Sequence, residues 1–541
     1  MSDQHETDIA TRPLDVRDRR VVTAAIVALL GTAISFRLLR LASVPGVSGD
    51  EGWWGIQALA WLSGRSYEAH TTSGNPIDLF FLVPLALAHA TAPPSFLLLR
   101  IVPALVNLLA LPVGFWFVRR LYGNTTAWIH TVGLAIMPTA IAHSRICQDP
   151  SQSIFWTSIV IYLALLGLKE RGRAWIYCGA ALLIFPVALW THPTNVFIAP
   201  FLVLPFVAAV RPRLPASRRG RVIILVVATL LLTVGLSIAG LTLGHLSAAN
   251  QSLDQPWLAI ASARMIDGGQ WFEFAANNAR LFNGVTIYHY FSGARPPTVP
   301  YDAGFVVVVV TALWGFLLTP AARRTPLDYG LIFACTTMWV GFYAFAGPQA
   351  LRPHFERWGL CLIAPGTLVL ARGLTAWIER MPRIRWFAIA AATLVATSLL
   401  RSFYVNYFEE FATTGGRSHL TYVTAATEPK QQALEHILSR SAGPDRVAIV
   451  TQQWWLVWPI AYLATEHPNV SVSMGLDVEH QSGFREALPK DRLFFVEFVG
   501  TPERAAAIDW IRQRGFPAAR TTIRDASGRE LLEILQVRAG R

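Results

Sequence analysis

Charged residues are scarce in this chain, and that scarcity limits which class of protein it belongs to. Only 15% of its 541 residues are Asp, Glu, Lys or Arg, whereas 53% are hydrophobic. This composition is too apolar for a soluble enzyme, and the many long apolar runs indicate a polytopic α-helical membrane protein. The formal net charge of +12 does not indicate a nucleic-acid partner, because the Arg residues stand in short clusters between apolar runs, where they set topology.

Cysteines are also few. No pair among them suggests a disulfide framework or a CxxC metal site. The sequence likewise shows no internal repeat and no long low-complexity tract. The four cysteines stand mostly in apolar runs, at Cys147, Cys178, Cys335 and Cys361.

Apolar runs long enough to cross a bilayer, by contrast, are abundant. We interpret residues 1–20 as a cytoplasmic tail and the run after it as a retained signal anchor. With the N-terminus inside, Arg clusters such as 119–120, 211–221 and 323–324 fall in the cytoplasm, as the positive-inside rule requires. The sequence therefore predicts about eleven transmembrane helices, at 21–43, 97–118, 125–142, 151–168, 174–191, 194–210, 222–244, 303–319, 329–346, 358–378 and 386–404.

One further apolar segment, residues 76–92, would reverse this topology if it crossed the membrane. It contains Asp78, Pro84 and His89 and has no basic flanks. We therefore expect an interfacial or re-entrant helix on the outer side, within a first outer loop over residues 44–96.

Two later regions are also expected outside. Residues 245–302 form a polar and aromatic outer loop, and residues 405–541 are predicted to form a small extracytoplasmic α/β domain. Within that domain, Gln452–Trp455 either stacks on sugar faces or packs in a core. Strands are expected over 446–451, 470–473, 492–498 and 531–537, and a helix over 502–514.

The most informative polar feature is the acidic pair Asp50-Glu51, just past the outer end of the first predicted span. Carboxylates beside a bilayer are costly unless they face water or a cavity, so the pair indicates a functional site. The alternative is that the pair caps the helix that follows, because acidic side chains suit a helix N-terminus.

Two outer turns carry further candidates. In the first, His143, Arg145 and Asp149 stand within seven consecutive residues, and the alternative to a site is a simple Arg145–Asp149 ion pair. The second turn contains His192, for which a solvated or capping histidine is the alternative reading.

A fourth cluster, residues 352–358, enters the tenth predicted span from outside. Its Arg352, His354 and Arg357 are suited to hold a phosphate, because Arg offers a planar fork matched to phosphate oxygens. The alternative is anchoring to lipid headgroups. Acids and cations on one side of the membrane suit transfer of a sugar from a lipid phosphate, with the cations on the leaving phosphate and a carboxylate as general base.

Several of these stretches carry a family resemblance. The stretches that carry it begin with the acidic pair and Asn75–Phe80. They continue with residues 99–105 and 119–123, with Ser144-Arg145 and Asp149, and with residues 354–358 before Pro365. On these stretches the chain resembles the GT-C superfamily of polyprenyl-phosphate-sugar-dependent glycosyltransferases. The branch is the family 39-type one of protein O-mannosyltransferases and lipid A aminoarabinose transferases.

The resemblance covers most of residues 21–405 and implies a GT-C transmembrane catalytic domain over 21–404. The chain departs from the family in having Asn75-Pro76-Ile77 where His-Pro-Pro is frequent. It also lacks the WWDxG-type signature of oligosaccharyltransferases, so transfer of a whole oligosaccharide to Asn is not expected.

The resemblance also implies roles for individual residues. Asp50 would be the catalytic base, Glu51 would support it, and Asp149 would position the acceptor or a metal. Mg²⁺ or Mn²⁺ is an open expectation, with Asp50 and Asp149 as the only candidate ligands. Donor phosphate would be held by Arg145, Arg352, His354 and Arg357, and substrate by His143, Asn75, His192 and Glu356.

The expected function is therefore transfer of a sugar, with inversion, from an undecaprenyl- or dolichyl-type phosphate to a glycan, lipid or protein acceptor. The expected setting is the outer face of a bacterial plasma membrane, with membrane lipids around the protein and no nucleic acid. A lipid-linked sugar flippase is the first alternative, because charged residues in polytopic proteins often line a pathway. An O-antigen ligase or polymerase is the second.

Overall fold

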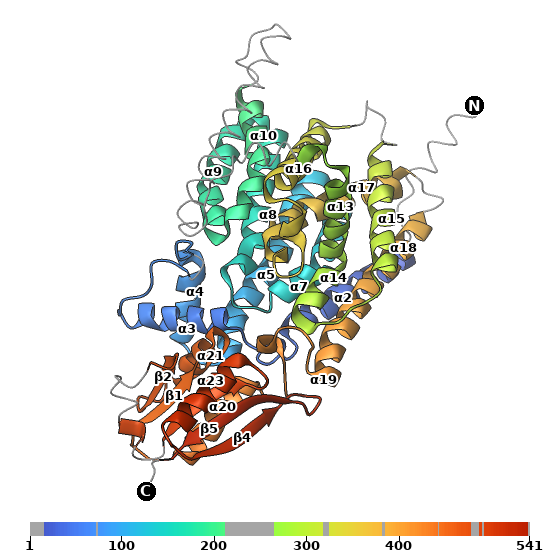
Figure 1. The fold of residues 1–541 in the computed structure, drawn as a ribbon. Helices are drawn as coiled ribbons and strands as arrows, with labels where there is room; N and C mark the ends of the chain where they lie inside the picture. Colours follow the sequence, from blue (N-terminus) through green and yellow to red (C-terminus); the bar gives the residue numbers. More distant parts are fainter. Residues whose placement is uncertain are drawn as a thin grey trace, which may run out of the picture.

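The computed structural model describes residues 16–71, 74–210, 264–317, 324–380, 385–441, 443–477, 486–488 and 492–538. Most of the chain before residue 415 is helical, and five strands follow it (Figure 1). The main helices of this first part are α2 (Val16–Leu38), α3 (Gly49–Leu62), α4 (Leu79–His89), α5 (Phe96–Tyr122), α6 (Asn124–Ile136), α7 (Pro138–His143), α8 (Ser153–Lys169), α9 (Ala174–Thr191), α10 (Ala199–Val210), α13 (Gly268–Asn283), α15 (Thr298–Leu317), α16 (Pro326–Ala346), α17 (Ile363–Arg380), α18 (Arg385–Phe403) and α19 (Glu410–Thr414).

Short 3₁₀ and π segments join several of these helices. The ones that bear on the site are η1 (Asp149–Gln152), η3 (Pro193–Ile198), η7 (Pro348–Leu351), η8 (Glu356–Leu362), and the π segments η5 (Tyr288–Ser292) and η9 (Tyr404–Glu409).

Within the described ranges, seven helices are long and apolar enough to cross a membrane. They coincide with seven of the eleven predicted runs, so the prediction of a multi-pass helical protein is confirmed. These helices are Arg20–Leu38, Phe96–Tyr122, Asp149–Lys169, Arg171–Thr191, Pro326–Ala346, Glu356–Glu379 and Trp386–Thr414.

The other four predicted runs differ in form. Run 125–142 is divided at Met137, whose ψ of 117° is extended, because Pro138 disfavours a helical conformation in the residue before it. Run 194–210 begins as the 3₁₀ segment η3 and continues as α10. Run 303–319 lies mostly in α15, and run 222–244 lies outside the described residues.

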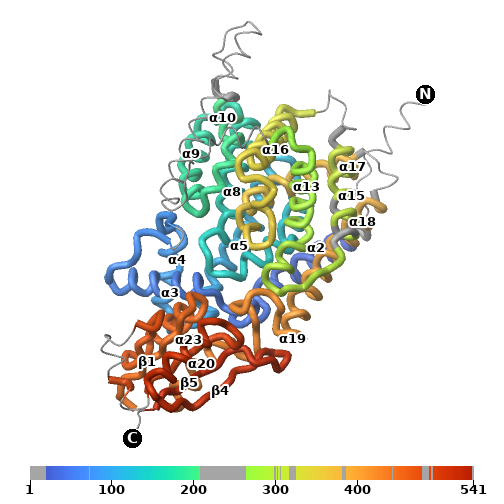
Figure 2. The backbone as a smooth tube through the Cα atoms, viewed as in Figure 1, coloured from blue at the N-terminus to red at the C-terminus, as the bar shows by residue number. Residues whose placement is uncertain are grey.

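The first and the last long helices are neighbours in space. The Phe36 ring in α2 lies 5.9 Å from the Phe403 ring in α18, and Figure 2 shows the two segments side by side. Segment 76–92 contains only α4, 11 residues long. That is about half the length that crossing a bilayer requires.

The C-terminal part is a mixed five-stranded sheet with strand order β2-β1-β3-β5-β4. Strands β2, β1 and β3 are parallel, and β5 joins β3 and β4 in antiparallel pairing. The four predicted strands and the predicted helix are confirmed, as β1, β2, β3, β5 and α23. Strand β4 and helices α20 and α21 are additional. The elements are α20 (Pro429–Arg440), β1 (Val447–Thr451), α21 (Trp454–Ala464), β2 (Val470–Met474), β3 (Leu493–Phe498), α23 (Pro502–Gln513), β4 (Ala518–Arg524) and β5 (Glu530–Val537).

Helix α21 connects the two parts of the molecule. Figure 1 shows it between the sheet and α3, at the end of the helical bundle. An apolar cluster joins Trp53 and Trp54 of α3 and Phe81 of α4 to Leu99 of α5 and Tyr462 of α21. The acidic pair at the start of α3 therefore lies at the junction between the helical part and the sheet.

Candidate active site

The two carboxylates of the acidic pair face different surroundings. Glu51 is buried, and its Oε2 accepts a hydrogen bond of 2.9 Å from the backbone N–H of Ser48, the residue that caps α3. The capping alternative therefore holds for Glu51, as expected for an acid at the third helical position. Asp50, by contrast, is only half-buried.

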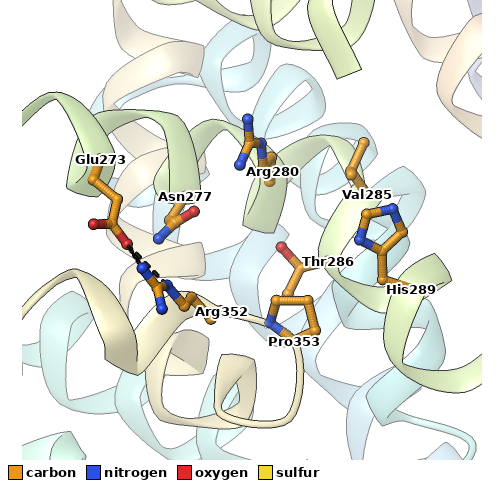
Figure 3. Close-up of a pocket in the computed structure, with 8 residues that line it drawn as sticks. All are labelled: Glu273, Asn277, Arg280, Val285, Thr286, His289, Arg352 and Pro353. Carbon is orange, nitrogen blue, oxygen red and sulfur yellow. Dashed lines mark hydrogen bonds and ion pairs between the residues drawn. The ribbon is translucent and has the colours of Figure 1, made fainter. Parts of the chain in front are cut away.

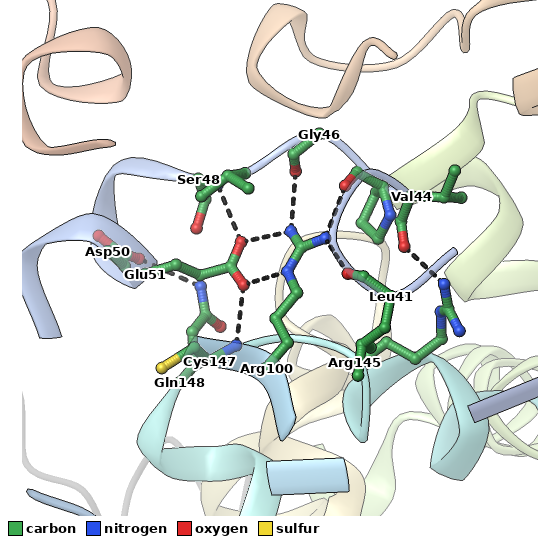
Figure 4. A network of polar contacts seen from close by, with 12 residues as sticks. Leu41, Val44, Gly46, Ser48, Asp50, Glu51, Arg100, Arg145, Cys147 and Gln148 are labelled. Carbon is green, nitrogen blue, oxygen red and sulfur yellow. Dashed lines mark hydrogen bonds and ion pairs between the residues drawn. The ribbon is translucent and has the colours of Figure 1, made fainter. Parts of the chain in front are cut away.

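Glu51 also forms a bidentate ion pair with Arg100 of α5 (Figure 4). Arg100 Nε donates to Glu51 Oε1 and Arg100 Nη2 donates to Oε2, each at 2.7 Å, and neither side chain is exposed. The remaining Arg100 donors reach the carbonyls of Leu41, Pro45 and Gly46. This network fixes loop 41–48 and the first turn of α3 against the N-terminal end of α5.

Arg145 supports the same loop. Its Nη atoms donate to the carbonyls of Phe36, Leu39 and Val44, and its guanidinium lies 4.9 Å from the Phe408 ring centre. The structure thus turns Arg145 towards the loop and not towards Asp149. The predicted alternative of an Arg145–Asp149 pair is not formed, and the side chain is fully buried.

Asp50 presents its carboxylate at the domain junction. Its Oδ1 accepts a hydrogen bond of 3.0 Å from the indole N–H of Trp454 in α21, and Oδ2 accepts one of 3.3 Å from the Gln148 amide. Burial raises the pKa of Asp50, whereas the Trp454 hydrogen bond and the charge of Arg357 lower it. A raised pKa is what proton acceptance near neutral pH requires of a carboxylate.

Two more aspartates, Asp149 and Asp78, belong to the same group of charges. Asp149, at the start of η1, is half-buried and within electrostatic range of Asp50, Asp78 and Arg357. Asp78 is buried at the cap of α4, where its Oδ1 accepts from the Phe80 N–H at 2.8 Å. Burial raises the pKa of Asp78 to about 7.

Arg357 is a cation within electrostatic range of Asp50 and Asp149. It lies in η8 and is half-buried, and its charge acts on Asp50 and Asp149. Within the described part of the chain, its guanidinium has no hydrogen bond and no ion pair within 4 Å. A half-buried guanidinium with free donors, near carboxylates, is suited to bind an incoming anion such as a phosphate.

His143 lies against Glu356, the residue that precedes Arg357 in the chain. His143 Nε2 lies 3.5 Å from Glu356 Oε1, and both side chains are buried. This contact is longer than a good hydrogen bond, and neither oxygen of Glu356 has another partner among the described residues. A buried carboxylate there adds negative potential beside Arg357.

His192 is a capping residue, as its alternative reading proposed. Its Nδ1 hydrogen-bonds Thr194 Oγ1 at 2.7 Å, and Thr194 in turn donates to the carbonyl of Trp358. It therefore orders the turn next to Arg357. Asn75 lies in a turn in which the Thr71 N–H donates to its carbonyl at 2.7 Å, three residues before Asp78.

Arg352 and His354 are placed apart from the aspartates. Arg352 is half-exposed and pairs with Glu273 at 2.6 Å. His354 has a left-handed backbone (φ 87°), uncommon outside glycine, and its ring centre lies 4.7 Å from that of Tyr290. The structure therefore brings Asp50, Asp149, His143, His192, Glu356 and Arg357 together, and leaves Arg352 and His354 at the edge of this group.

A cavity of about 320 Å³ lies beside this edge, between α13, η5 and the segment around Arg352 (Figure 3). The ion pair of Arg352 and Glu273 forms one side, and Arg280 and His289 are among the other lining residues. The neighbouring Tyr290 lies within electrostatic range of Asp50 and Arg357. Successive residues of η5 thus belong to the cavity and to the candidate site.

Three residues of the site were not proposed from the sequence, Asp78, Arg100 and Gln148, and Trp454 was expected only to stack on sugar faces or to pack in a core. Asp78 had a usable signal, because an acid in an apolar segment requires an explanation. The hydrogen bond of Trp454 crosses 404 positions, and no local pattern indicates it.

The described residues do not provide a metal site. Nowhere in the described ranges do three or more His, Cys, Asp or Glu side chains form a group that could hold a metal ion. Both oxygens of Asp50 already accept hydrogen bonds from Gln148 and Trp454. Asp50 and Asp149 would hold Mg²⁺ or Mn²⁺ only together with phosphate oxygens of a bound substrate.

Comparison with solved structures identifies the fold. The chain is similar to ArnT from Cupriavidus metallidurans in the apo state, with a TM-score of 0.52 and 13% identity over 95% of this chain and 98% of that one. ArnT bound to undecaprenyl phosphate gives a TM-score of 0.52 and 14% identity over the same shares. The likeness extends over nearly the full chain and confirms the GT-C fold expected from the sequence.

A third similar structure is the oligosaccharyltransferase AglB from Archaeoglobus fulgidus, in complex with an inhibitory peptide and a dolichol-phosphate. Its TM-score is 0.47 and its identity 13%, over 83% of this chain and 64% of that one. No family model matches the sequence, and no curated protein matches it significantly.

Proposed function

We propose that this protein is a membrane glycosyltransferase that moves a sugar from a polyprenyl-phosphate donor to an acceptor. The observation that carries the proposal is the placement of half-buried Asp50 within the electrostatic range of Arg357. The guanidinium of Arg357 has no ion-pair partner within 4 Å in the described ranges. The Asp50 carboxylate can then accept a proton from the acceptor while the Arg357 guanidinium binds the phosphate of the donor in the same site.

The proposed reaction is a single displacement at the anomeric carbon. Asp50 takes the proton of the acceptor's hydroxyl or amine while that atom forms a bond to the anomeric carbon. The bond from the anomeric carbon to the phosphate oxygen breaks, and polyprenyl phosphate leaves with the electron pair. The configuration inverts, because the acceptor attacks from the face opposite the phosphate.

The rate acceleration expected from each catalytic group can be given as an order of magnitude. General-base assistance accelerates such reactions by roughly 10²–10⁴-fold. Arg357 stabilises the charge that develops on the leaving phosphate, and removal of one such group costs about 10²–10³-fold. Asp149 positions the acceptor, and Glu51 holds the turn that carries Asp50.

The position of the site favours a transferase over a flippase. Helix α3, whose first turn carries Asp50, lies at the end of the helical bundle beside the sheet (Figure 1), whereas transporter sites lie near the bilayer midplane. We place this end, and the domain over 405–541, on the outer side of the plasma membrane, with the N-terminus in the cytoplasm and eleven spans in all. The donor would be of the undecaprenyl or dolichyl type, which the undecaprenyl phosphate bound to ArnT supports.

The proposal is tested with purified protein and a panel of radiolabelled polyprenyl-phosphate sugars. Wild type should give a labelled product with at least one donor, and Asp50→Asn should lower the rate by at least a hundredfold. Asp509→Asn, at an exposed surface ion pair of α23, is the matched control and should be fully active. Full activity of Asp50→Asn would overturn the assignment of the base, and translocation without transfer would favour a flippase.

A further inference from the structure

Helix α21 of the C-terminal part lies against α3 at a distance that only glycine allows. Gly49, Gly52 and Gly55 share one face of α3, at spacings of three residues. A Cβ atom at Gly49 would lie 2.4 Å from Trp454 Cδ1, and one at Gly55 would lie 2.5 Å from the Tyr462 ring. The backbone of α3 is therefore in direct contact with the aromatic side chains of α21.

Polar contacts hold the two parts in this register. The Tyr462 hydroxyl accepts from the Ser95 N–H at 3.0 Å and lies 2.7 Å from His89 Nε2. Glu428 Oε1, before α20, accepts from the Val47 N–H at 3.2 Å, on the loop that leads into α3. The C-terminal part thus contacts α3, α4 and the start of α5 close to the acidic pair.

Within this contact, one side chain reaches the candidate base. The indole N–H of Trp454 donates to Asp50 Oδ1 at 3.0 Å, while its neighbour Trp458 has no hydrogen-bond partner for its own N–H among the described residues. The two rings pack edge to face at 5.1 Å on the same helix. Trp454 therefore differs from Trp458 in its hydrogen bond to Asp50, because both residues carry the same indole ring.

We propose that Trp454 is a positioning residue for Asp50, so that the C-terminal domain completes the active site of the transmembrane domain. The inference rests on the proposed function, in which Asp50 is the base. An ionised carboxylate offers about four lone-pair sites. Trp454 occupies one site on Oδ1 and Gln148 one on Oδ2, which fixes the carboxylate plane and leaves acceptor capacity for the incoming hydroxyl or amine.

The consequence is a specific kinetic phenotype. Without the indole N–H, the carboxylate rotates more freely and fewer bound complexes have the acceptor proton aligned with it. We expect Trp454→Phe to lower kcat on the order of tenfold while the donor KM changes less than twofold. A role in docking alone would instead affect Trp454 and Trp458 alike.

The experiment compares Trp454→Phe with Trp458→Phe in the full-length protein, beside Asp50→Asn. A third variant replaces Trp454 with 3-benzothienylalanine, which keeps the ring shape and removes only the N–H. The inference is supported if both changes at position 454 lower kcat about tenfold and Trp458→Phe changes it less than twofold.

Two results contradict the inference, and they are distinguishable. If Asp50→Asn is inactive but the benzothienyl variant keeps wild-type kcat, Trp454 does not position the base and the proposed function stands. If Asp50→Asn keeps full activity, the proposed function fails and this inference fails with it. Gly49→Ala is not used as a substitute for Trp454→Phe, because its Cβ would also lie 2.6 Å from the Trp454 carbonyl oxygen and would displace α21 as a whole.

Discussion

Arg100 and Glu51 meet through two hydrogen bonds of 2.7 Å each, with neither side chain exposed to solvent. The pair joins α5 to the first turn of α3, across 49 positions of the chain. Two backbone N–H groups, of Ser48 and Cys147, donate to the same carboxylate. Glu51 therefore fixes the backbone from which Asp50 projects, and the acidic pair divides into one structural and one candidate catalytic member.

Replacement of Glu51 tests this division. Glu51→Gln leaves the Arg100 charge buried without a counter-charge, and breaking a buried pair in this way typically costs about 3–5 kcal/mol. We expect a clear fall in the unfolding midpoint of the detergent-solubilised protein, followed by tryptophan fluorescence. Glu530→Gln is the matched control, because its ion pair with Arg524 is exposed and worth about 0–1 kcal/mol. Equal midpoints for both variants would contradict the structural role.

Arg357 is expected to act on the donor and not on stability. Arg357→Gln removes a guanidinium that has no ion pair within 4 Å in the described ranges, so folding should be little affected. The loss of phosphate stabilisation should lower kcat/KM for the donor by about 10²–10³-fold. Free polyprenyl phosphate should also lose most of its inhibition of the variant. Arg512→Gln, on the exposed face of α23, is the control, and similar inhibition of both variants would exclude Arg357 from the phosphate site.

The sequence predicted the helical class, seven of the spans and four of the five strands, because each depends on local composition. It missed strand β4, whose residues Ala518–Arg524 are largely polar and lie at the sheet edge. It also left Trp454 open between sugar stacking and core packing. Neither reading anticipated a hydrogen bond to Asp50, since that contact depends on how two distant parts dock.

The arginines predicted to bind phosphate also show what the sequence could not predict. Arg145, Arg352 and Arg357 are equally basic in the sequence, yet the structure gives them different surroundings. Arg145 donates its hydrogen bonds to backbone carbonyls, and Arg352 forms an ion pair with Glu273. Arg357 instead lies within electrostatic range of Asp50 and Asp149. Which cation has free donors is decided by tertiary packing, and the sequence motif alone does not reveal it.

The glycine face of α3 predicts a docking defect. A Cβ at Gly52 would lie 2.4 Å from the backbone of Trp458 and Pro459, so Gly52→Ala must separate α3 from α21. We expect faster proteolysis of the C-terminal domain and a fall in transfer activity. Gly179→Ala, in α9 with no atom within 4 Å of the added Cβ, should be neutral or slightly stabilising, by up to about 1 kcal/mol. Unchanged proteolysis of Gly52→Ala would contradict the close packing.

The pH dependence of transfer distinguishes Asp50 from Asp78. Asp50 accepts a proton only as a carboxylate, so activity should be present above its pKa and lost as the pH falls through it. Burial raises that pKa above the ordinary value of 3.8, while the charge of Arg357 lowers it. We therefore expect the acid limb of kcat/KM to lie above pH 3.8, and to move to higher pH in Arg357→Gln.

Asp78 is a competing source of that limb, because burial raises its pKa to about 7. Asp78→Asn removes this titration and leaves Asp50 with its Trp454 and Gln148 hydrogen bonds. If Asp50 is the base, the acid limb persists in Asp78→Asn, shifted slightly at most. Disappearance of the limb in that variant, with activity retained at low pH, would assign the titration to Asp78. Asp78 would then govern the acid limb through its charge at the cap of α4, without being the base, because a variant that lacks its carboxylate still transfers sugar.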